Sequence, residues 1–373
     1  MSILSFRQAL LVSPGGVLSY DDGTFTRSTE GSMLTGAPTD GSSSFLSWVG
    51  TNVRRDEDRG DGAGPLFLAE GSRQNAVIQS RELNNNAIWG AFGTVTPGQA
   101  DPEAGTAADR INNGAAVIGR YQVVAAAGRV TSGWVRRGAG AGTYVLYQYL
   151  NAGSGTEVYG TAAAAFGRVA TPYHAGPIWV NVQDTRGPGT HTFSTRAAAA
   201  ADAVWDLMQT EAGRFPSSAI RTVAAVVTRG ADTLTFAPSS VPAWLLTKAG
   251  FHQVSPVFAD TDLVNTNALW LLSVDGGAAG IRIFRDAVDT RVEALAGGAV
   301  VARSAALAFA RDGLLGTVTW DAAAGLVRVG GVAGAAGTPW AWSAPVAGLR
   351  VGGIYGAASE AFCRVSQIYR GAA

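Results

Sequence analysis

Glycine is the feature of this sequence that most restricts how the chain can fold. The chain has 373 residues, of which 49 are glycine, well above the share of about 7% in ordinary proteins. The glycines follow no three-residue period, which excludes a collagen triple helix. They stand between short apolar runs, and this pattern predicts many short strands joined by turns. We therefore expect an all-β protein.

The length and the distribution of polar residues indicate two folded units and an N-terminal arm. A chain of 373 residues is long enough for two or three domains. Residues 1–62 contain a small polar run at 39–44 and a charge cluster at 54–59, neither of which can build a large core. The predicted fold is two tandem antiparallel β-sandwich (jelly-roll) domains behind this arm. The predicted boundaries are residues 1–62 for the arm, 63–240 for the first domain, 241–256 for a linker and 257–373 for the second domain.

Local patterns predict individual elements within these units. Short apolar runs in the first unit, among them residues 76–80 and 203–207, predict strands. The alanine run at 197–201 leaves helix and strand open, and residues 243–248 favour a short helical turn. In the second unit, the gaps at residues 286–291 and 321–325 predict hairpin turns. Residues 313–331 are expected to form a meander in which alternate side chains face a core.

The charge composition argues against several classes of partner. Twenty-eight Lys and Arg residues balance 28 Asp and Glu residues, for a net charge of +0. This balance gives no electrostatic reason to expect nucleic acid or an anionic membrane as a partner. Charged residues make up only 15% of the chain, which indicates that other chains cover part of the surface. We expect a homo-oligomer.

The N-terminus and the cysteine content bear on location. The first residues carry only a short apolar run, which predicts no signal peptide. No apolar stretch reaches the roughly 18 residues of a membrane-spanning helix. Cys363 is the single cysteine, so no intrachain disulfide can form. We expect synthesis in a cytoplasm, with release by a route such as lysis.

The residue types that carry out catalysis or hold cofactors form no recognisable motif. The three histidines lack the spacing of a metal site, no G-x-S-x-G motif is present, and no D-x-D-x-D-G calcium loop occurs. The carboxylates at 56–58 stand among arginines, where local ion pairs explain them. The glycine-rich run at 138–142 precedes a strand rather than a helix, which argues against phosphate binding. We predict no catalytic residue, no metal and no cofactor.

Aromatic side chains remain as candidates for a binding site. Sugars stack their C–H faces on exposed rings that have hydrogen-bonding groups beside them. Trp340 and Trp342 flank one alanine in a Gly/Pro-rich loop, which favours exposure. Residues two apart share a face of a strand, and the sequence has such pairs in its first unit. For each ring, burial in a core is the alternative. The candidates for glycan contact are Trp134, Arg136, Tyr147, Tyr149, Trp179, Trp340 and Trp342.

Several segments of the arm and of the first unit resemble the virion proteins of tailed phages. Phe25-Thr26-Arg27-Ser28 is similar to their "FTR" start. Residues 64–75, Gly-Pro-Leu-Phe-Leu-Ala-Glu-Gly-Ser-Arg-Gln-Asn, resemble their "LLEGxRTN" segment, with Gln74 in place of Thr and Ala69 inserted. The most specific block is Gly-Arg-Phe-Pro-Ser-Ser-Ala-Ile at 213–220, followed by Val-Thr-Arg-Gly-Ala-Asp at 227–232. It resembles "GxFPTSYIPT…VTRAAD".

The second unit resembles the concanavalin A-like lectin sandwich that follows in many of those proteins. Val-Thr-Trp-Asp at 318–321 and Val-Arg-Val-Gly-Gly at 327–331 carry this likeness. The resemblance covers nearly the whole chain and implies a carbohydrate-binding-module-like jelly roll followed by a lectin-like sandwich. It implies tail fibres, tail spikes, head fibres or decoration proteins, in which a homotrimer is the commonest state of fibres.

Three functions follow as hypotheses. The first is a non-enzymatic structural component of a phage virion, projecting from the particle surface as a fibre or spike. Its partners would be other virion proteins, bound through residues 1–62, and a host surface glycan. The second is a capsid decoration or cement protein without a ligand. The third is a glycan-depolymerising spike enzyme, which needs a carboxylate pair in a groove and usually a long β-helix, whose repeats the sequence lacks.

Overall fold

The computed structural model shows an all-β chain, as predicted from the glycine pattern. It describes residues 16–18, 23–27, 30–34, 46–49, 55–56, 66–92, 95–112, 119–125, 129–149, 155–171, 190–196, 202–212, 216–256, 268–285, 289–307, 316–353 and 362–370. These residues contain no α-helix and two short 3-10 helices, η3 (Pro238–Ser240) and η4 (Ala243–Leu246). The turn at η4 agrees with the short helical turn favoured by the sequence.

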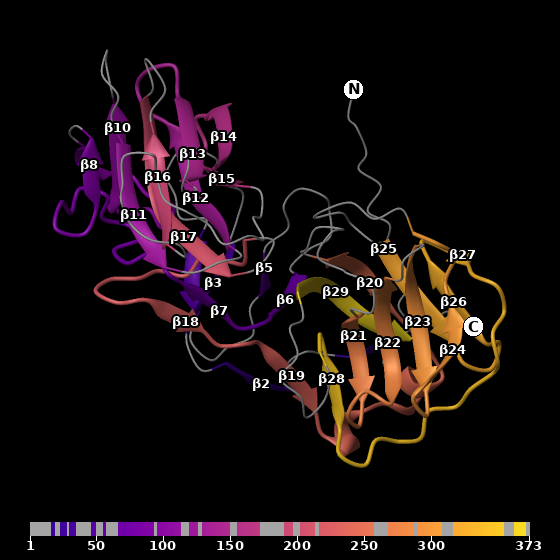
Figure 1. The fold of residues 1–373 in the computed structure, drawn as a ribbon. Helices are drawn as coiled ribbons and strands as arrows, with labels where there is room; N and C mark the ends of the chain where they lie inside the picture. The colour runs from indigo at the N-terminus through magenta and orange to yellow at the C-terminus, as the bar shows by residue number, and fades with distance from the viewer. Residues whose placement is uncertain are drawn as a thin grey trace, which may run out of the picture.

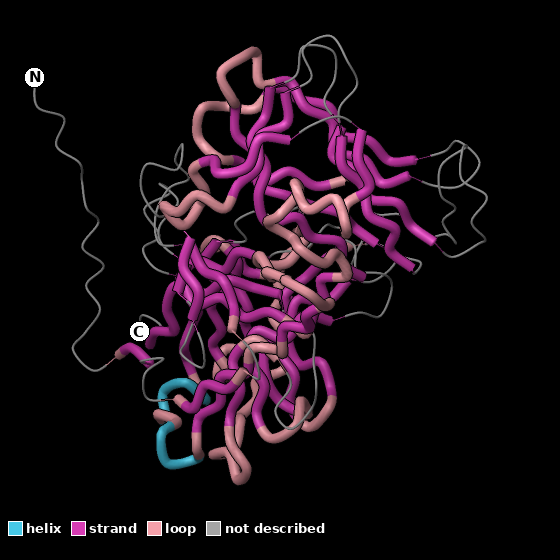
Figure 2. Tube along the Cα trace, turned by 90° about the vertical axis from the view of Figure 1, so that its left-hand side faces the viewer, coloured by secondary structure: helices cyan, strands magenta, loops and turns pink. Residues whose placement is uncertain are grey.

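Two lobes make up the molecule, and each contains two facing sheets (Figure 1). Figure 2 shows the same two groups of strands from the side, with the helical turns at the end of the second lobe that is remote from the first. Neighbouring strands are antiparallel throughout both lobes. The predicted class of antiparallel β-sandwiches is therefore confirmed.

The first lobe has two five-stranded sheets and two short strand pairs. One sheet has the order β15 (Gly167–Ala170), β12 (Arg129–Arg137), β17 (Asp202–Ala212), β10 (Ala108–Asn112) and β9 (Val95–Gln99). The other has the order β14 (Gly155–Thr161), β13 (Thr143–Tyr149), β16 (Thr190–Arg196), β11 (Gly119–Ala125) and β8 (Gly90–Phe92). The short pairs are β7 (Arg73–Asn75) with β18 (Val227–Arg229), and β3 (Gly31–Leu34) with β4 (Leu46–Val49).

The two sheets of the first lobe pack through apolar side chains from both of their inner faces. Trp205 on β17 and Tyr144 on β13 meet edge to face, with ring centroids 5.5 Å apart. Trp89, Ile111 and Leu146 lie in the same core, and each is at most 1% exposed. Aromatic contacts of this kind add to the free energy gained by removing the rings from water.

The second lobe has a seven-stranded and an eight-stranded sheet. The seven-stranded order is β2 (Thr24–Thr26), β19 (Thr233–Phe236), β28 (Leu349–Val351), β21 (Ala268–Val274), β22 (Ala279–Arg285), β23 (Thr290–Ala296) and β24 (Ala299–Arg303). The other order is β27 (Val332–Ala333), β26 (Leu326–Val329), β25 (Gly316–Asp321), β20 (Lys248–Pro256), β29 (Phe362–Arg370), β6 (Leu66–Glu70) and β5 (Arg55–Asp56). A further strand, β1 (Val17–Leu18), pairs with β29.

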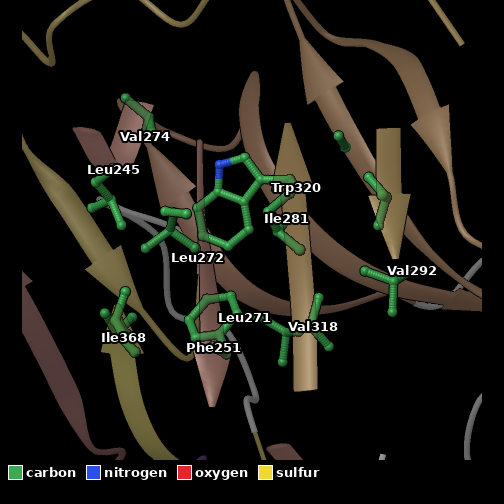
Figure 3. Close-up of a cluster of buried hydrophobic side chains, with 14 of the residues drawn as sticks. Leu245, Phe251, Leu271, Leu272, Val274, Ile281, Val292, Val318, Trp320 and Ile368 are labelled. Atoms are coloured by element: carbon green, nitrogen blue, oxygen red, sulfur yellow. The ribbon is translucent and has the colours of Figure 1, made fainter. Parts of the chain in front are cut away.

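Trp320 lies at the centre of the second core. It is 1% exposed, and Figure 3 shows its indole among Phe251, Leu272 and Ile281. The Phe251 ring lies 5.5 Å from it. The side chains come from both sheets, so this core holds the second sandwich together.

The predicted turns of the second lobe are present. Strands β25 and β26 pair from Asp321 and Leu326 outward, so residues 322–325 form the turn. Gly325 occupies that turn with a φ of +65°, a conformation that costs other residues more than glycine. Strands β22 and β23 pair antiparallel up to Arg285 and Thr290, so the chain reverses direction in the gap predicted at 286–291, of which residues 286–288 lie outside the described part of the chain. β27 then continues the meander on β26.

The chain passes between the two lobes more than once, which the predicted boundaries did not anticipate. Strands β1 and β2 belong to sheets of the second lobe, β3 and β4 lie with the first, and β5 and β6 return to the second. After β18 the chain re-enters the second lobe at β19. The described strands of residues 1–62 are therefore parts of both lobes rather than a separate arm. The extent of independently folding units stays a prediction.

Residues 241–256 also differ from the prediction, because most of them form the nine-residue strand β20. β20 lies between β25 and β29 in its sheet, and Phe251 and Val254 are each 0% exposed. The prolines that flank this segment suggested a connector. Burial between two neighbouring strands decided its conformation instead.

Candidate functional site

The tryptophans proposed for sugar contact are buried. Trp134 is 6% exposed, Trp340 8% and Trp342 6%, and a ring needs a free face to stack on a sugar. Trp134 lies in an apolar cluster with Leu46 and Phe166. The exposure predicted for Trp340 and Trp342 is therefore wrong, Trp134 follows the alternative of burial in a core, and a glycan contact through these rings stays untested.

The reason for the burial of the Trp340 loop is that it covers the end of the second core. Trp340 donates its backbone N–H to Ala322 at 2.9 Å, and the Trp342 indole donates to the Leu295 carbonyl at 2.7 Å. The two rings lie 6.0 Å apart, so they share a face as predicted. That face points inward, which strand alternation alone cannot determine.

The other predicted contact residues have separate positions. Arg136 on β12 is half-buried, and its guanidinium lies 5.4 Å from the centre of the Phe166 ring. Tyr147 and Tyr149 belong to β13, where they pair with Ser194 and Thr192 of β16. Their side chains, like the whole of Trp179, lie outside the described part of the chain. Among the predicted residues whose side chains are described, Trp134 and Arg136 lie in the first lobe and Trp340 and Trp342 in the second, so these four do not form one site.

The glycine-rich run at 138–142 does receive an anion, but the anion is a side chain of the same protein. The Asp202 carboxylate accepts the backbone N–H of Gly140 at 2.8 Å and pairs with Arg110 at 2.5 Å. A Cβ added at Gly138 would clash with Asp202 Oδ1. Because an internal carboxylate already accepts the backbone N–H of this loop, the loop does not offer that donor to a phosphate.

Buried ion pairs mark the place where the chain passes between the lobes. We call Arg27, Glu70, Ser218, Arg229 and Asp232 the waist. Arg27 pairs with Asp232 at 3.0 Å, and Glu70 pairs with Arg229 at 2.6 Å, with all four side chains at most 1% exposed. Since buried charges are tolerated only when they are paired, the waist holds three chain crossings in fixed positions.

The waist contains residues from four of the segments that carry the phage resemblance, those at 25–28, 64–75, 213–220 and 227–232. Ser218 donates to Glu70 through its backbone N–H at 2.8 Å and through its hydroxyl at 2.5 Å. Arg229 also donates to the Gly71 carbonyl at 2.8 Å. The backbone N–H of Glu70 donates a hydrogen bond to the Asp232 carboxylate at 3.0 Å. These hydrogen bonds therefore hold together segments of the chain that lie almost 160 residues apart in sequence.

A second polar cluster lies where the β3–β4 hairpin meets the first lobe. Arg81 donates to both oxygens of Asp206, at 3.1 and 2.9 Å, and to Glu103 at 2.9 Å. Asp101 shapes the neighbouring loop, because its carboxylate accepts the backbone N–H groups of Glu103, Gly105 and Ala107 at 2.7–2.9 Å. The Trp48 indole N–H donates to Glu103 at 2.6 Å. No sequence motif predicted this cluster.

This cluster lacks the geometry of a glycosidase site. Burial raises the pKa of Asp206 to about 7, although Arg81 opposes the shift. An acid that is protonated near neutral pH is one part of such a site. The Asp206 side chain, however, is 0% exposed, so it cannot reach a glycosidic oxygen in this structure.

The described residues meet neither the requirements of a metal site nor those of a membrane-spanning helix. No group of three or more His, Cys, Asp or Glu side chains among them is placed to hold a metal ion. His191 lies on β16 and His252 on β20, in different lobes, and His174 is outside the described residues. Within the same part of the chain, no helix has the length and apolar character needed to cross a bilayer.

Asp109 gives the first lobe a predicted pH dependence. Burial raises its pKa to about 6, against opposing hydrogen bonds from backbone N–H groups of Asn84 and Leu83 and the charge of Arg120. An unfolded Asp has a pKa of about 3.9. The folded protein therefore binds this proton more tightly, and the associated stability is lost as the pH rises from about 4 to about 6.

We expect this loss to be on the order of 2 kcal/mol for Asp109. The Asp109→Asn variant, which resembles the protonated form, should show a correspondingly weaker fall in the free energy of unfolding over that range. Urea denaturation at several pH values measures both slopes. Equal slopes for the wild type and the variant would contradict the assignment.

Comparisons with known proteins give little guidance about identity. No family model matches the chain, and no curated protein matches it. Among solved structures, the N-terminal CBM22-1-CBM22-2 tandem domain of Xyn10C from Paenibacillus barcinonensis is similar, with 11% identity and a TM-score of 0.27. The match covers 81% of this chain and 98% of that chain. A likeness of this degree carries no conclusion about what the present chain does.

Proposed function

We propose that this chain is a non-catalytic structural subunit on the surface of a phage virion, a fibre or spike component that contacts host surface glycans. The waist is the observation that carries this proposal. Glu70, Ser218 and Arg229 come from separate segments that resemble tailed-phage virion proteins, and they contact one another. A chance likeness of short motifs would not require their residues to form one buried network.

The arrangement of the lobes suits a projecting structural subunit. Repeated chain crossings and two buried ion pairs tie the lobes to each other. Movement of one lobe against the other would separate these paired charges, and breaking a buried ion pair has a high free-energy cost. A body of fixed shape is what a rigid extension from a particle requires.

The proposal includes a location and partners. The chain would be made in the cytoplasm of the host bacterium and would function at the virion surface. It would form a homo-oligomer, taken as a trimer, and would bind other virion proteins through surface of residues 1–62 that the strand pairings leave available. Nucleic acid and membrane are not among the proposed partners, and no cofactor is required.

Imaging of phage particles tests the location. An antibody against this chain, with a gold label, should mark the outside of purified particles at the head, the tail or the baseplate. Labelling of the head in a regular lattice, together with an absence of glycan binding, would favour a capsid decoration protein. Absence of the chain from particles would contradict both structural functions.

An adsorption assay tests the contact with the host. Purified full-length chain, added to host cells before the phage, should occupy surface glycans and slow phage adsorption. The chain heated until it unfolds serves as the control. Unchanged adsorption at saturating concentrations of the folded chain would argue against glycan contact by this subunit.

A further inference from the structure

The β3–β4 hairpin carries the half-exposed tryptophan Trp48 to the surface of the first lobe. We define the Trp48 site as Glu30, Trp48, Arg81, Glu103 and Arg221. The hairpin is anchored beside it, because Ser32 donates to the Ala219 carbonyl at 2.8 Å and Leu46 donates to the Pro102 carbonyl at 3.2 Å. The site thus unites residues from the N-terminal segment and the first lobe.

The indole of Trp48 is held in one orientation. Its N–H donates to Glu103 Oε1 at 2.6 Å, and the Arg221 guanidinium carbon lies 4.6 Å from its ring centre. Its buried part packs against the apolar cluster of Leu46 and Trp134. A ring that is already ordered loses little conformational entropy when it meets a ligand.

Polar groups beside the ring keep unused hydrogen-bonding capacity. Arg221 donates to Glu30 through Nε and Nη2, at 2.8 and 2.9 Å, and its Nη1 bonds to no described residue. Glu103 accepts Trp48 and Arg81 through Oε1, and its Oε2 accepts from no described residue. The side chains of Arg221, Glu30 and Glu103 are 39%, 45% and 22% exposed. Donors and acceptors therefore face solvent together.

The balance of charge at this surface indicates the class of ligand. Arg221 pairs with Glu30, whereas Arg81 is shared by Glu103, Asp101 and Asp206, so carboxylates outnumber guanidinium groups at this surface. An anionic ligand would meet these carboxylates, whereas hydroxyl groups can each accept from a guanidinium and donate to a carboxylate.

We propose that the Trp48 site binds a neutral glycan. This inference rests on the proposed glycan contact and gives it a position, in place of the buried rings at 134, 340 and 342. The part of the Trp48 ring that stays exposed and that Arg221 does not cover contacts the C–H surface of a sugar, and Arg221 Nη1 and Glu103 Oε2 bind its hydroxyl groups. Docking of the hairpin accounts for the anchoring contacts, but none of the described hydrogen bonds uses Arg221 Nη1 or Glu103 Oε2.

The test starts with the full-length chain on an array of bacterial oligosaccharides, both neutral and acidic. We expect binding to neutral members. Calorimetry with the tightest neutral oligosaccharide then compares the wild type with Arg221→Ala and Glu30→Gln. Arg221→Ala should weaken binding about tenfold, because a charged donor is lost, and Glu30→Gln should weaken it to a smaller extent. Thermal unfolding establishes that the variants fold.

Lys248→Ala is the matched control, because Lys248 forms a similarly exposed ion pair with Asp321 in the second lobe, with side chains 39% and 18% exposed. Its affinity should equal that of the wild type. Binding that Arg221→Ala leaves unchanged would overturn this site while leaving the proposed function in place. Binding to acidic members alone would overturn the ligand class. No binding to any glycan would overturn the proposed glycan contact, and this inference with it.

Discussion

The Arg229→Met variant is expected to have a free energy of unfolding about 3–5 kcal/mol below that of the wild type. Arg229 is 0% exposed and donates to Glu70, Ser218 and Gly71. The variant leaves the Glu70 carboxylate buried without its cationic partner, and an unpaired buried charge is far more costly than an absent pair. Urea denaturation followed by circular dichroism measures the change.

Two further variants separate this effect from the loss of any ion pair. Lys248→Met removes a partly exposed pair, which is worth about 0–1 kcal/mol at most sites. In the double variant Glu70→Gln/Arg229→Met no charge remains to be buried at this pair, so part of the lost stability should return. A loss below about 1 kcal/mol in Arg229→Met would show that the waist does not depend on this pair.

The Trp320→Ala variant is expected to lose about 3–5 kcal/mol of stability. Trp320 contacts Phe251 and Trp342, with ring centroids 5.5 and 5.9 Å apart, and lies at the centre of the second core (Figure 3). Alanine leaves a cavity that strands paired on both sides cannot close by moving together. Urea denaturation again measures the loss.

Comparison variants make this prediction specific. Trp244→Ala on η4 should cost less, because Trp244 is only half-buried at the edge of the same core. Trp320→Phe should also cost less than alanine. It keeps most of the apolar volume and removes a buried indole N–H that bonds to no described residue. Equal losses for Trp320→Ala and Trp244→Ala would contradict the central position of Trp320.

Local conformation was predictable at several places. The Asp321–Gly325 gap was predicted as a hairpin turn, and the pairing of β25 with β26 confirms it. Residues 203–207 were predicted as a strand and lie within β17. These successes depend on alternation of side chains and on glycine at positive φ, both of which are properties of neighbouring residues.

Residues 76–80 show where local patterns mislead. They were predicted as a strand, but the structure has an irregular segment there. The Asn75 side chain accepts the backbone N–H groups of Val77 and Thr210, both at 3.1 Å, and Gln79 has a φ of +52°. A distant strand thus supplies hydrogen bonds that compete with a ladder.

The sequence located the candidate site less accurately than it located the strands and turns. Alternation predicted correctly that Trp340 and Trp342 share a face, but the side facing the core depends on what covers that face. Trp48, Glu103 and Arg221 are far apart in sequence, and no motif links them. Only information about which distant positions contact each other could have shown that these three residues form one site.

The glycine punctuation by itself determined that this protein is an all-β chain of short strands, because turns and strand alternation depend on adjacent residues. The tertiary structure decided which strands pair, that the chain passes repeatedly between two lobes, and which rings are buried. Strand pairing joins residues that are distant in sequence, and any strand edge offers the same backbone groups to many partners. Packing and the pairing of buried charges at the waist select one arrangement among them.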